Sequence, residues 1–286
     1  MSHTVIIPSA KRPQILHETI TSLLQQQTSA DQILISVADT SYVLPETLAF
    51  PKVQIVLARP GLCQQVNDAI PYIDSCASFV SILDDDVELA PDYFTHARSF
   101  SQEHPDIAAF SGFLVRNGNV ERSEGRSLLL SFADQPDYSF EIQSTVYGCN
   151  INTRPEILRT VKFDERLPLY GWLCDADFGF RCRSFGICVS YNACRLVHLM
   201  TSSGRISGTR MGFAQIMNPY YLHCKGIIPF WEVFHNHWLL ATRNNLIKLF
   251  LFDQRIDRQG RLKGNLMAFS MILRGQIEPE FMEKLS

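Results

Sequence analysis

Three consecutive carboxylates have the clearest chemical potential in this sequence. Asp84, Asp85 and Asp86 directly follow residues 79–83, an apolar segment with the composition of a buried strand. Clustered acids at a strand end repel one another unless a cation neutralises them. Carboxylates that leave room for substrate oxygens are typical ligands of Mg²⁺ or Mn²⁺, which bind phosphates at the same time. The sequence therefore predicts a divalent-metal site that holds a diphosphate; the alternative is a solvated acidic turn before Pro91.

The bulk composition narrows the class of protein. The chain has 286 residues, of which 46% are hydrophobic and 19% charged, as in an ordinary globular protein. Its net charge of −3 gives no general attraction for nucleic acid. The eight cysteines contain no Cys-x-x-Cys pair, which favours reduced thiols over a zinc site or a disulfide framework. We find no signal-peptide pattern and no apolar run of about 18 residues, and therefore expect a cytoplasmic protein without a spanning helix.

The first 90 residues alternate apolar segments with amphipathic ones. We expect strands at residues 4–7, 32–37, 53–57 and 79–83, and helices at residues 13–24 and 62–70. This order predicts right-handed crossovers and a mainly parallel sheet. Ligands of such sheets bind at the carboxyl ends of the strands, so Pro8, Ser9 and Asp39 should share one rim with the acids.

Several segments of this half match a known pattern in order and spacing. They are Val5-Ile6-Ile7-Pro8, Asp39, Gly61, Asn67 and Leu83-Asp84-Asp85-Asp86. Together they resemble the nucleotide-sugar half of a family 2 glycosyltransferase with the GT-A fold. The resemblance implies that Asp39 contacts the nucleotide base, that Asp84 contacts the nucleoside, and that Asp86 binds the metal.

The remaining donor contacts are expected from neighbouring residues. We include Pro8, Ser9, Asn67 and Asp85 among the substrate-binding residues. The family often has arginine just before the asparagine, where this chain has Val66. A basic contact must then come from elsewhere, and the candidates are Lys11, Arg12 and Arg59, of which we select Arg12.

A second block of the chain extends the resemblance to the acceptor side. It comprises residues 145–150, 161–165 and 170–172 and the sequence Cys174-Asp175-Ala176-Asp177. The family has a Glu-Asp-x-Asp motif here, and its general base aligns with Asp175, whereas Cys174 replaces the glutamate. A general base must stay ionised within reach of the acceptor hydroxyl, and a helix N-terminus favours the ionised form. Helix capping is the alternative role for Asp175 and Asp177.

Two further residues are candidate ligands of the diphosphate. His198 ends one of two strands expected at residues 187–191 and 195–199, and in the family a histidine after this strand often approaches the metal. A packed core histidine is the alternative. Arg205 lies in a Ser/Gly-rich stretch that suits a loop closing over phosphate, and an ordinary surface arginine is its alternative.

The rest of the chain is less specific. We expect a helix at residues 91–101, a strand at 107–115 and a loop at 116–126, and we assign nothing to residues 127–143. From residue 211 the pattern is helical, and basic residues outnumber acidic ones between residues 243 and 274. With Trp231, Phe234 and Trp238 nearby, these helices could dock on an anionic bilayer; a solvated basic face over an aromatic core is the alternative.

These observations predict an α/β protein with a GT-A (Rossmann-like, mainly parallel) sheet flanked by helices. Residues 1–210 would form this domain, divided into a nucleotide-sugar half (1–90) and an acceptor half (91–210), and residues 211–286 a helical extension. The expected enzyme is an inverting hexosyltransferase that uses Mn²⁺ or Mg²⁺ and a nucleoside diphosphate sugar, in the first instance a UDP-sugar.

We expect the acceptor to be a saccharide or lipid-linked saccharide of surface polysaccharide or glycolipid synthesis, handled at the cytoplasmic face of a membrane. Two alternatives stay open. One is a catalytically inactive nucleotide-sugar-binding module, which Cys174 and Val66 keep in consideration. The other is a sugar-1-phosphate nucleotidyltransferase, which requires a glycine-rich loop that Pro8-Ser9-Ala10-Lys11 does not supply.

Overall fold

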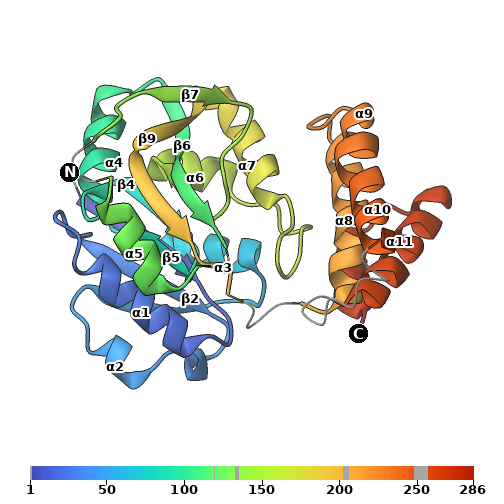
Figure 1. Cartoon of the computed structure of the whole chain (residues 1–286), viewed down its shortest axis with the longest axis horizontal. Helices are drawn as coiled ribbons and strands as arrows, with labels where there is room; N and C mark the ends of the chain where they lie inside the picture. Colours follow the sequence, from blue (N-terminus) through green and yellow to red (C-terminus); the bar gives the residue numbers. More distant parts are fainter. Residues whose placement is uncertain (1, 119, 133–134, 202–205, 248–256) are drawn as a thin grey trace. The chain divides into compact units, whose positions relative to one another are not determined.

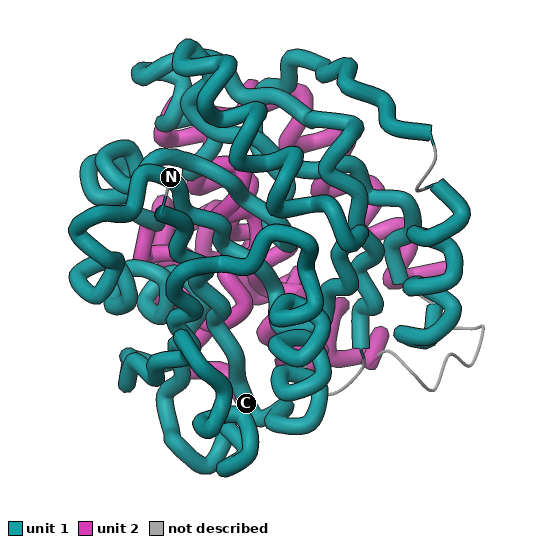
Figure 2. The backbone as a smooth tube through the Cα atoms, turned by 90° about the vertical axis from the view of Figure 1, so that its left-hand side faces the viewer, with its two compact units in different colours: residues 1–163, 178–204 teal, residues 164–177, 205–286 magenta. Residues whose placement is uncertain are grey.

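The computed structural model describes residues 2–118, 120–132, 135–201, 206–247 and 257–286. The chain forms two compact units, which Figure 2 colours separately. The first comprises residues 1–163 and 178–204, and the second comprises residues 164–177 and 205–286. The predicted division into a GT-A domain, residues 1–210, and a helical extension, residues 211–286, stays a prediction.

A nine-stranded sheet flanked by helices forms the first unit (Figure 1). The strands lie in the order β3-β2-β1-β4-β8-β6-β9-β5, and β7 pairs with β9. Only β5, β7 and β8 run against the direction of the other described strands, so the predicted α/β class with a mainly parallel sheet is confirmed. The strands are β1 (Ser2–Pro8), β2 (Gln32–Val37), β3 (Val53–Leu57), β4 (Ala77–Leu83), β5 (Val87–Leu89), β6 (Ile107–Asn117), β7 (Phe140–Gln143), β8 (Asn150–Thr153) and β9 (Ile187–His198).

The helices of the first unit carry their apolar residues on the face that meets the sheet. In α4, Tyr93, Phe94, Ala97 and Phe100 recur at helical spacing and are all buried, as the sequence predicts. The helices are α1 (Pro13–Leu23), α2 (Pro45–Leu48), α3 (Leu62–Ala69), α4 (Tyr93–Glu103), α5 (Arg122–Leu130) and α6 (Pro155–Val161). Helix α7 (Cys174–Cys182) begins in the second unit and ends in the first.

Two expectations about local structure are wrong. Residues 116–117 and 122–126 are not part of a loop, because β6 extends to Asn117 and α5 begins at Arg122. The buried carboxylate of Glu88 accepts hydrogen bonds from Arg122 (2.8 Å) and Arg126 (2.9 Å), which anchors α5 despite its polar composition. The two strands expected at residues 187–199 are one continuous strand, β9, whose pairing with β6 absorbs irregularities of register.

The second unit is helical. Its helices are α8 (Gly208–Cys224), α9 (Phe230–Glu232), α10 (Leu240–Ile247) and α11 (Arg258–Leu273), with a π-helical turn at Val233–Leu239. Gly212 of α8 allows a close approach of α11, because a Cβ atom there would lie 2.0 Å from the carbonyl oxygen of Arg261. None of the helices in the described part of the chain has the length and apolar content needed to cross a bilayer.

Candidate active site

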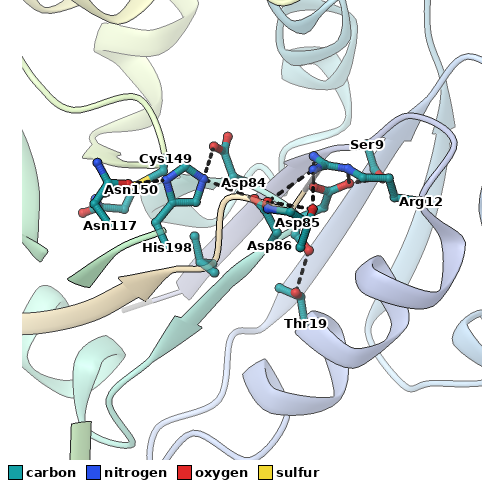
Figure 3. Close-up of polar contacts among 12 residues, drawn as sticks. Ser9, Arg12, Thr19, Asp84, Asp85, Asp86, Asn117, Cys149, Asn150 and His198 are labelled. Atoms are coloured by element: carbon teal, nitrogen blue, oxygen red, sulfur yellow. Dashed lines mark hydrogen bonds and ion pairs between the residues drawn. The ribbon is translucent and has the colours of Figure 1, made fainter. Parts of the chain in front are cut away.

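The three acids of the central motif lie in three different environments. They follow β4, which pairs with β1 on one side and β8 on the other, and they form the turn into β5 (Figure 3). The exposed fraction of the side chain is 27% for Asp84, 0% for Asp85 and 4% for Asp86. The three carboxylates therefore differ in how far solvent and ligands can reach them.

Asp84, Asp86 and His198 point toward one another (Figure 3). His198 is the last residue of β9, and its Nε2 lies 3.3 Å from Asp86 Oδ1 and 3.5 Å from Asp84 Oδ2. One ligand atom from each residue lies within 4.8 Å of the other two. Two carboxylate oxygens and one imidazole nitrogen at this separation fit a single divalent cation of the Mn²⁺ or Mg²⁺ type.

The electrostatics of this group also favour a cation. Burial acts to lower the pKa of His198, but the hydrogen bond with Asp86 and the charge of Asp84 outweigh it and leave that pKa raised. Burial acts to raise the pKa of Asp86, but His198 and Arg12 outweigh it and hold that pKa well below its usual range. Asp86 therefore stays ionised at neutral pH.

Only one oxygen of Asp86 faces His198. The other oxygen, Oδ2, accepts hydrogen bonds from the backbone nitrogen of Thr201 (2.9 Å), the Thr201 hydroxyl (3.1 Å) and Arg12 (3.2 Å). These donors fix the carboxylate so that Oδ1 is presented to the histidine. Thr201 is a member of the site that the sequence did not identify, since nothing in its neighbourhood singles out one hydroxyl.

Arg12 and Ser9 bind Asp85 rather than lying free at the rim. The Arg12 guanidinium contacts both carboxylate oxygens of Asp85, and the Ser9 hydroxyl donates to Oδ2. Burial raises the pKa of Asp85 to about 7, although Arg12 and Ser9 act in the opposite direction. All three were predicted to bind substrate, whereas these contacts favour a supporting role for Asp85, and Arg12 links it to Asp86.

The other predicted donor-side residues have separate surroundings. Pro8 is the buried last residue of β1. Asp39 is exposed after β2 and accepts a hydrogen bond from the backbone nitrogen of Ser41 (2.8 Å), which lowers its pKa. Asn67, on α3, is half-buried and binds the backbone of Phe163. Arg59, one of the alternative basic candidates, forms an ion pair with Asp68 (2.6 Å).

The candidate base lies on the part of α7 that belongs to the second unit. Asp175 is half-buried in the first turn of the helix, where its Oδ1 accepts a hydrogen bond from the backbone nitrogen of Ala176 (2.9 Å). Its neighbour Cys174 is buried. A helix N-terminus favours an ionised carboxylate, which is the form that a general base requires.

Asp177 has different surroundings from Asp175. It is fully buried, and Lys225, at the end of α8, contacts it and also Asp164, at 2.6 Å. Tyr221 donates a further hydrogen bond to Asp164 (2.8 Å). Asp177 is therefore part of the internal support of the segment before α7, and its partner there is Lys225. Arg205, the predicted phosphate ligand, lies outside the described residues.

Comparisons with known proteins agree with this geometry. The sequence model of a family described as Glycosyl transferase family 2 matches residues 4–163. No curated protein matches the chain in sequence. Among solved structures, residues 1–349 of S. aureus TarS in complex with UDP-GlcNAc match with a TM-score of 0.59 and 13% identity, over 96% of this chain and 93% of that one.

Two further structures show the same fold. GalNAc-T7 with UDP, GalNAc and Mn²⁺ matches with a TM-score of 0.55 and 12% identity, over 99% of this chain and 56% of that one. The mannosyltransferase PcManGT from Pyrobaculum calidifontis, in complex with GDP-Man and Mn²⁺, matches with a TM-score of 0.54 and 14% identity, over 99% and 78%. At these identities the structural similarity shows the fold alone, and the match of residues 4–163 to the family model shows the family. The chain belongs to glycosyl transferase family 2 and has the GT-A fold.

Proposed function

We propose that this glycosyltransferase moves a sugar from a nucleoside diphosphate sugar to an acceptor hydroxyl in a metal-dependent, inverting reaction. The observation that carries the proposal is the convergence of Asp84, Asp86 and His198 at the carboxyl end of β4. When bound there, Mn²⁺ or Mg²⁺ would neutralise charge on the departing diphosphate. A UDP-sugar is our first choice of donor, since TarS and GalNAc-T7 were crystallised with UDP-GlcNAc and UDP; PcManGT, crystallised with GDP-Man, makes a GDP-sugar the next choice.

The protein's own residues divide the work in this proposal. Asp39 is exposed and ionised where the nucleotide base is expected, and Asp84 is the most accessible acid of the motif. Asp175 would remove the proton from the acceptor hydroxyl as that hydroxyl attacks the sugar. Attack opposite the leaving diphosphate inverts the anomeric centre, and the Asp175 carboxylate at the start of α7 is the group suited to accept the proton.

We further propose a saccharide or lipid-linked saccharide acceptor in surface polysaccharide or glycolipid synthesis, handled by hexosyl transfer at the cytoplasmic face of a membrane. The support for membrane contact is the second unit's exposed apolar side chains, such as Trp231, Leu266 (70% exposed) and Leu273 (87%). Arg243 and Lys263 are exposed in the same unit, and basic side chains among apolar ones suit an anionic bilayer surface.

The test is a panel of nucleoside diphosphate sugars, each added with and without Mn²⁺ while thermal unfolding is followed. A ligand that binds only the folded protein raises its melting temperature by mass action. We expect one donor to stabilise the wild-type protein only when Mn²⁺ is present, and we expect Asp86→Ala to lose that response. Equal stabilisation with and without Mn²⁺ in both proteins would contradict the metal-dependent reaction.

A catalytically inactive nucleotide-sugar-binding module is the second candidate. It is favoured by Cys174, a buried neutral residue where the family motif has glutamate. Both candidates predict donor binding, but only the enzyme releases nucleoside diphosphate when an acceptor is added. Coupled detection of the released diphosphate with a panel of saccharide acceptors distinguishes them.

A further inference from the structure

Asn117 contacts Nδ1 of His198, the ring nitrogen that points away from the acids. It is the last residue of β6, and the parallel pairing of β6 with β9 places it opposite His198 (Figure 3). Its side-chain oxygen, Oδ1, lies 3.1 Å from His198 Nδ1. The backbone nitrogen of Gly118 also donates to the carbonyl oxygen of His198 (2.7 Å), which fixes the main chain at the same point.

The Asn117 amide has a hydrogen-bond partner at each of its ends. Its nitrogen, Nδ2, donates to the hydroxyl of Tyr147 (2.9 Å), and its oxygen, Oδ1, is directed at the imidazole. Tyr147 is itself held to β6, because its backbone nitrogen donates to the hydroxyl of Ser111 (2.6 Å). The Tyr147 hydroxyl can donate or accept a hydrogen bond, so the protonation of the imidazole decides which end of the amide faces the ring.

In this orientation the amide oxygen can only accept a hydrogen bond, so Nδ1 of His198 carries the proton. In the neutral imidazole the lone pair then lies on Nε2, the nitrogen that faces Asp84 and Asp86 at 3.5 and 3.3 Å. Histidines that bind metals commonly donate their other N–H to such an acceptor, which fixes the tautomer and the ring orientation. Without Asn117 the ring could rotate, and the proton could occupy either nitrogen.

We propose that Asn117 is a positioning residue that holds His198 in the tautomer and orientation required to bind a divalent cation. The inference rests on the proposed metal-dependent function and adds a residue to it. Nothing in the local sequence around Asn117 indicates the role, because it arises from the register between β6 and β9. Asn117 is exposed, so its replacement should leave the fold intact.

The experiment is a titration of the full-length protein with Mn²⁺ alone, with the free ion measured by electron paramagnetic resonance. Asn117→Ala removes the acceptor and should raise the Kd for Mn²⁺ by about 10-fold to 100-fold, the usual effect of losing a hydrogen bond to a ligating histidine. Asn117→Asp keeps an acceptor oxygen in place and should bind Mn²⁺ at least as tightly as the wild type. His198→Ala provides the reference for loss of the ligand itself.

The double variant Asn117→Ala/His198→Ala tests whether Asn117 acts through the histidine. We expect it to bind Mn²⁺ no more weakly than His198→Ala alone. A wild type that binds Mn²⁺ only as weakly as Asp86→Ala would refute the metal site and the inference with it. The role of Asn117 alone would be overturned by a different result. In that result the wild type binds Mn²⁺ more tightly than Asp86→Ala, but the Kd of Asn117→Ala stays within about threefold of the wild-type Kd, far below the expected range. The role would also be overturned if Asn117→Ala weakened Mn²⁺ binding by the same factor in the wild-type protein and in His198→Ala.

Discussion

Asn67 binds both polar groups of the backbone of Phe163. Its side-chain nitrogen donates to the Phe163 carbonyl oxygen (2.9 Å), and the Phe163 backbone nitrogen donates to its side-chain oxygen (2.8 Å). The pair joins α3 to the segment after α6, across 96 residues of sequence. The Asn67 side chain thus makes the two hydrogen bonds that a neighbouring strand would otherwise make with the backbone of Phe163.

The first prediction concerns the stability that this pair provides. Asn67→Ala leaves two backbone groups without their partner, each of which costs about 1–3 kcal/mol if it is buried. We expect the free energy of unfolding, measured by urea denaturation, to decrease by about 2–6 kcal/mol for the two groups together. Asn236→Ala, at an exposed position in the second unit, is the matched control and should change little. If Asn67→Ala unfolds like the wild type but loses nucleotide affinity, the asparagine contacts the substrate instead.

Arg12 supports the buried carboxylate of Asp85, and its removal should be costly. Breaking a buried ion pair from one side typically destabilises a protein by about 3–5 kcal/mol, because the remaining group keeps an unpaired charge or must take up a proton. We expect Arg12→Met to lose stability in that range in urea denaturation.

The double variant Arg12→Met/Asp85→Leu removes both charges and should recover much of the loss. If the double variant is no more stable than Arg12→Met, pairing with Asp85 is not the reason for the effect. Ser9 would then be the next residue to replace, because it also donates to the Asp85 carboxylate.

Asp175→Asn tests the proposed base. The amide keeps the size of the side chain but cannot accept the acceptor's proton, so transfer at saturating donor should fall by about 10²–10⁴. Donor affinity, measured by calorimetry, should be nearly unchanged. Asp257→Asn is the matched control, since Asp257 caps α11 through a hydrogen bond to Gly260 (2.8 Å) and asparagine is an equally good cap. A transfer rate like that of this control would assign Asp175 to capping alone.

The cluster around Asp164 predicts how the stability of the second unit changes with pH. Burial acts to raise the pKa of Asp164, but hydrogen bonds from Lys225 and Tyr221 outweigh it and leave the pKa lowered. A carboxyl whose pKa is lower in the folded state stabilises the protein above its unfolded pKa, which is about 3.9. That contribution is lost as the pH falls through the folded pKa.

Unfolding should therefore be compared for wild type and Asp164→Asn from neutral pH down to about pH 3, across the unfolded pKa. The wild-type advantage should be constant above about pH 5 and should shrink below about pH 4. An advantage that stays constant through acid pH would mean that the charge of Asp164 contributes nothing to it.

Features that depend on residues close together in the sequence could be predicted from it. The apolar face of α4 and the acids after β4 follow from local composition, and both lie where expected. The partners of those acids depend on strand register and on side chains distant in sequence. His198 was identified through the family resemblance, whereas Asn117 becomes its neighbour only when β6 and β9 pair. Lys225 and Asp177 are 48 residues apart, and no local pattern indicates that they meet.

The division of the chain into two units has a consequence for how such enzymes can be recombined. The chain leaves the first unit at residue 164, returns at residue 178 and leaves again at residue 205. The short excursion, 164–177, contains Asp164, Asp177 and the candidate base, and the first two depend on Lys225 of the later segment. A chimera that exchanged only residues 205–286 would combine them with residues 164–177 of the other parent, whose contacts evolved with a different C-terminal segment. If acceptor specificity resides in the second unit, its transfer between homologues would therefore require residues 164–177 and 205–286 to be exchanged together.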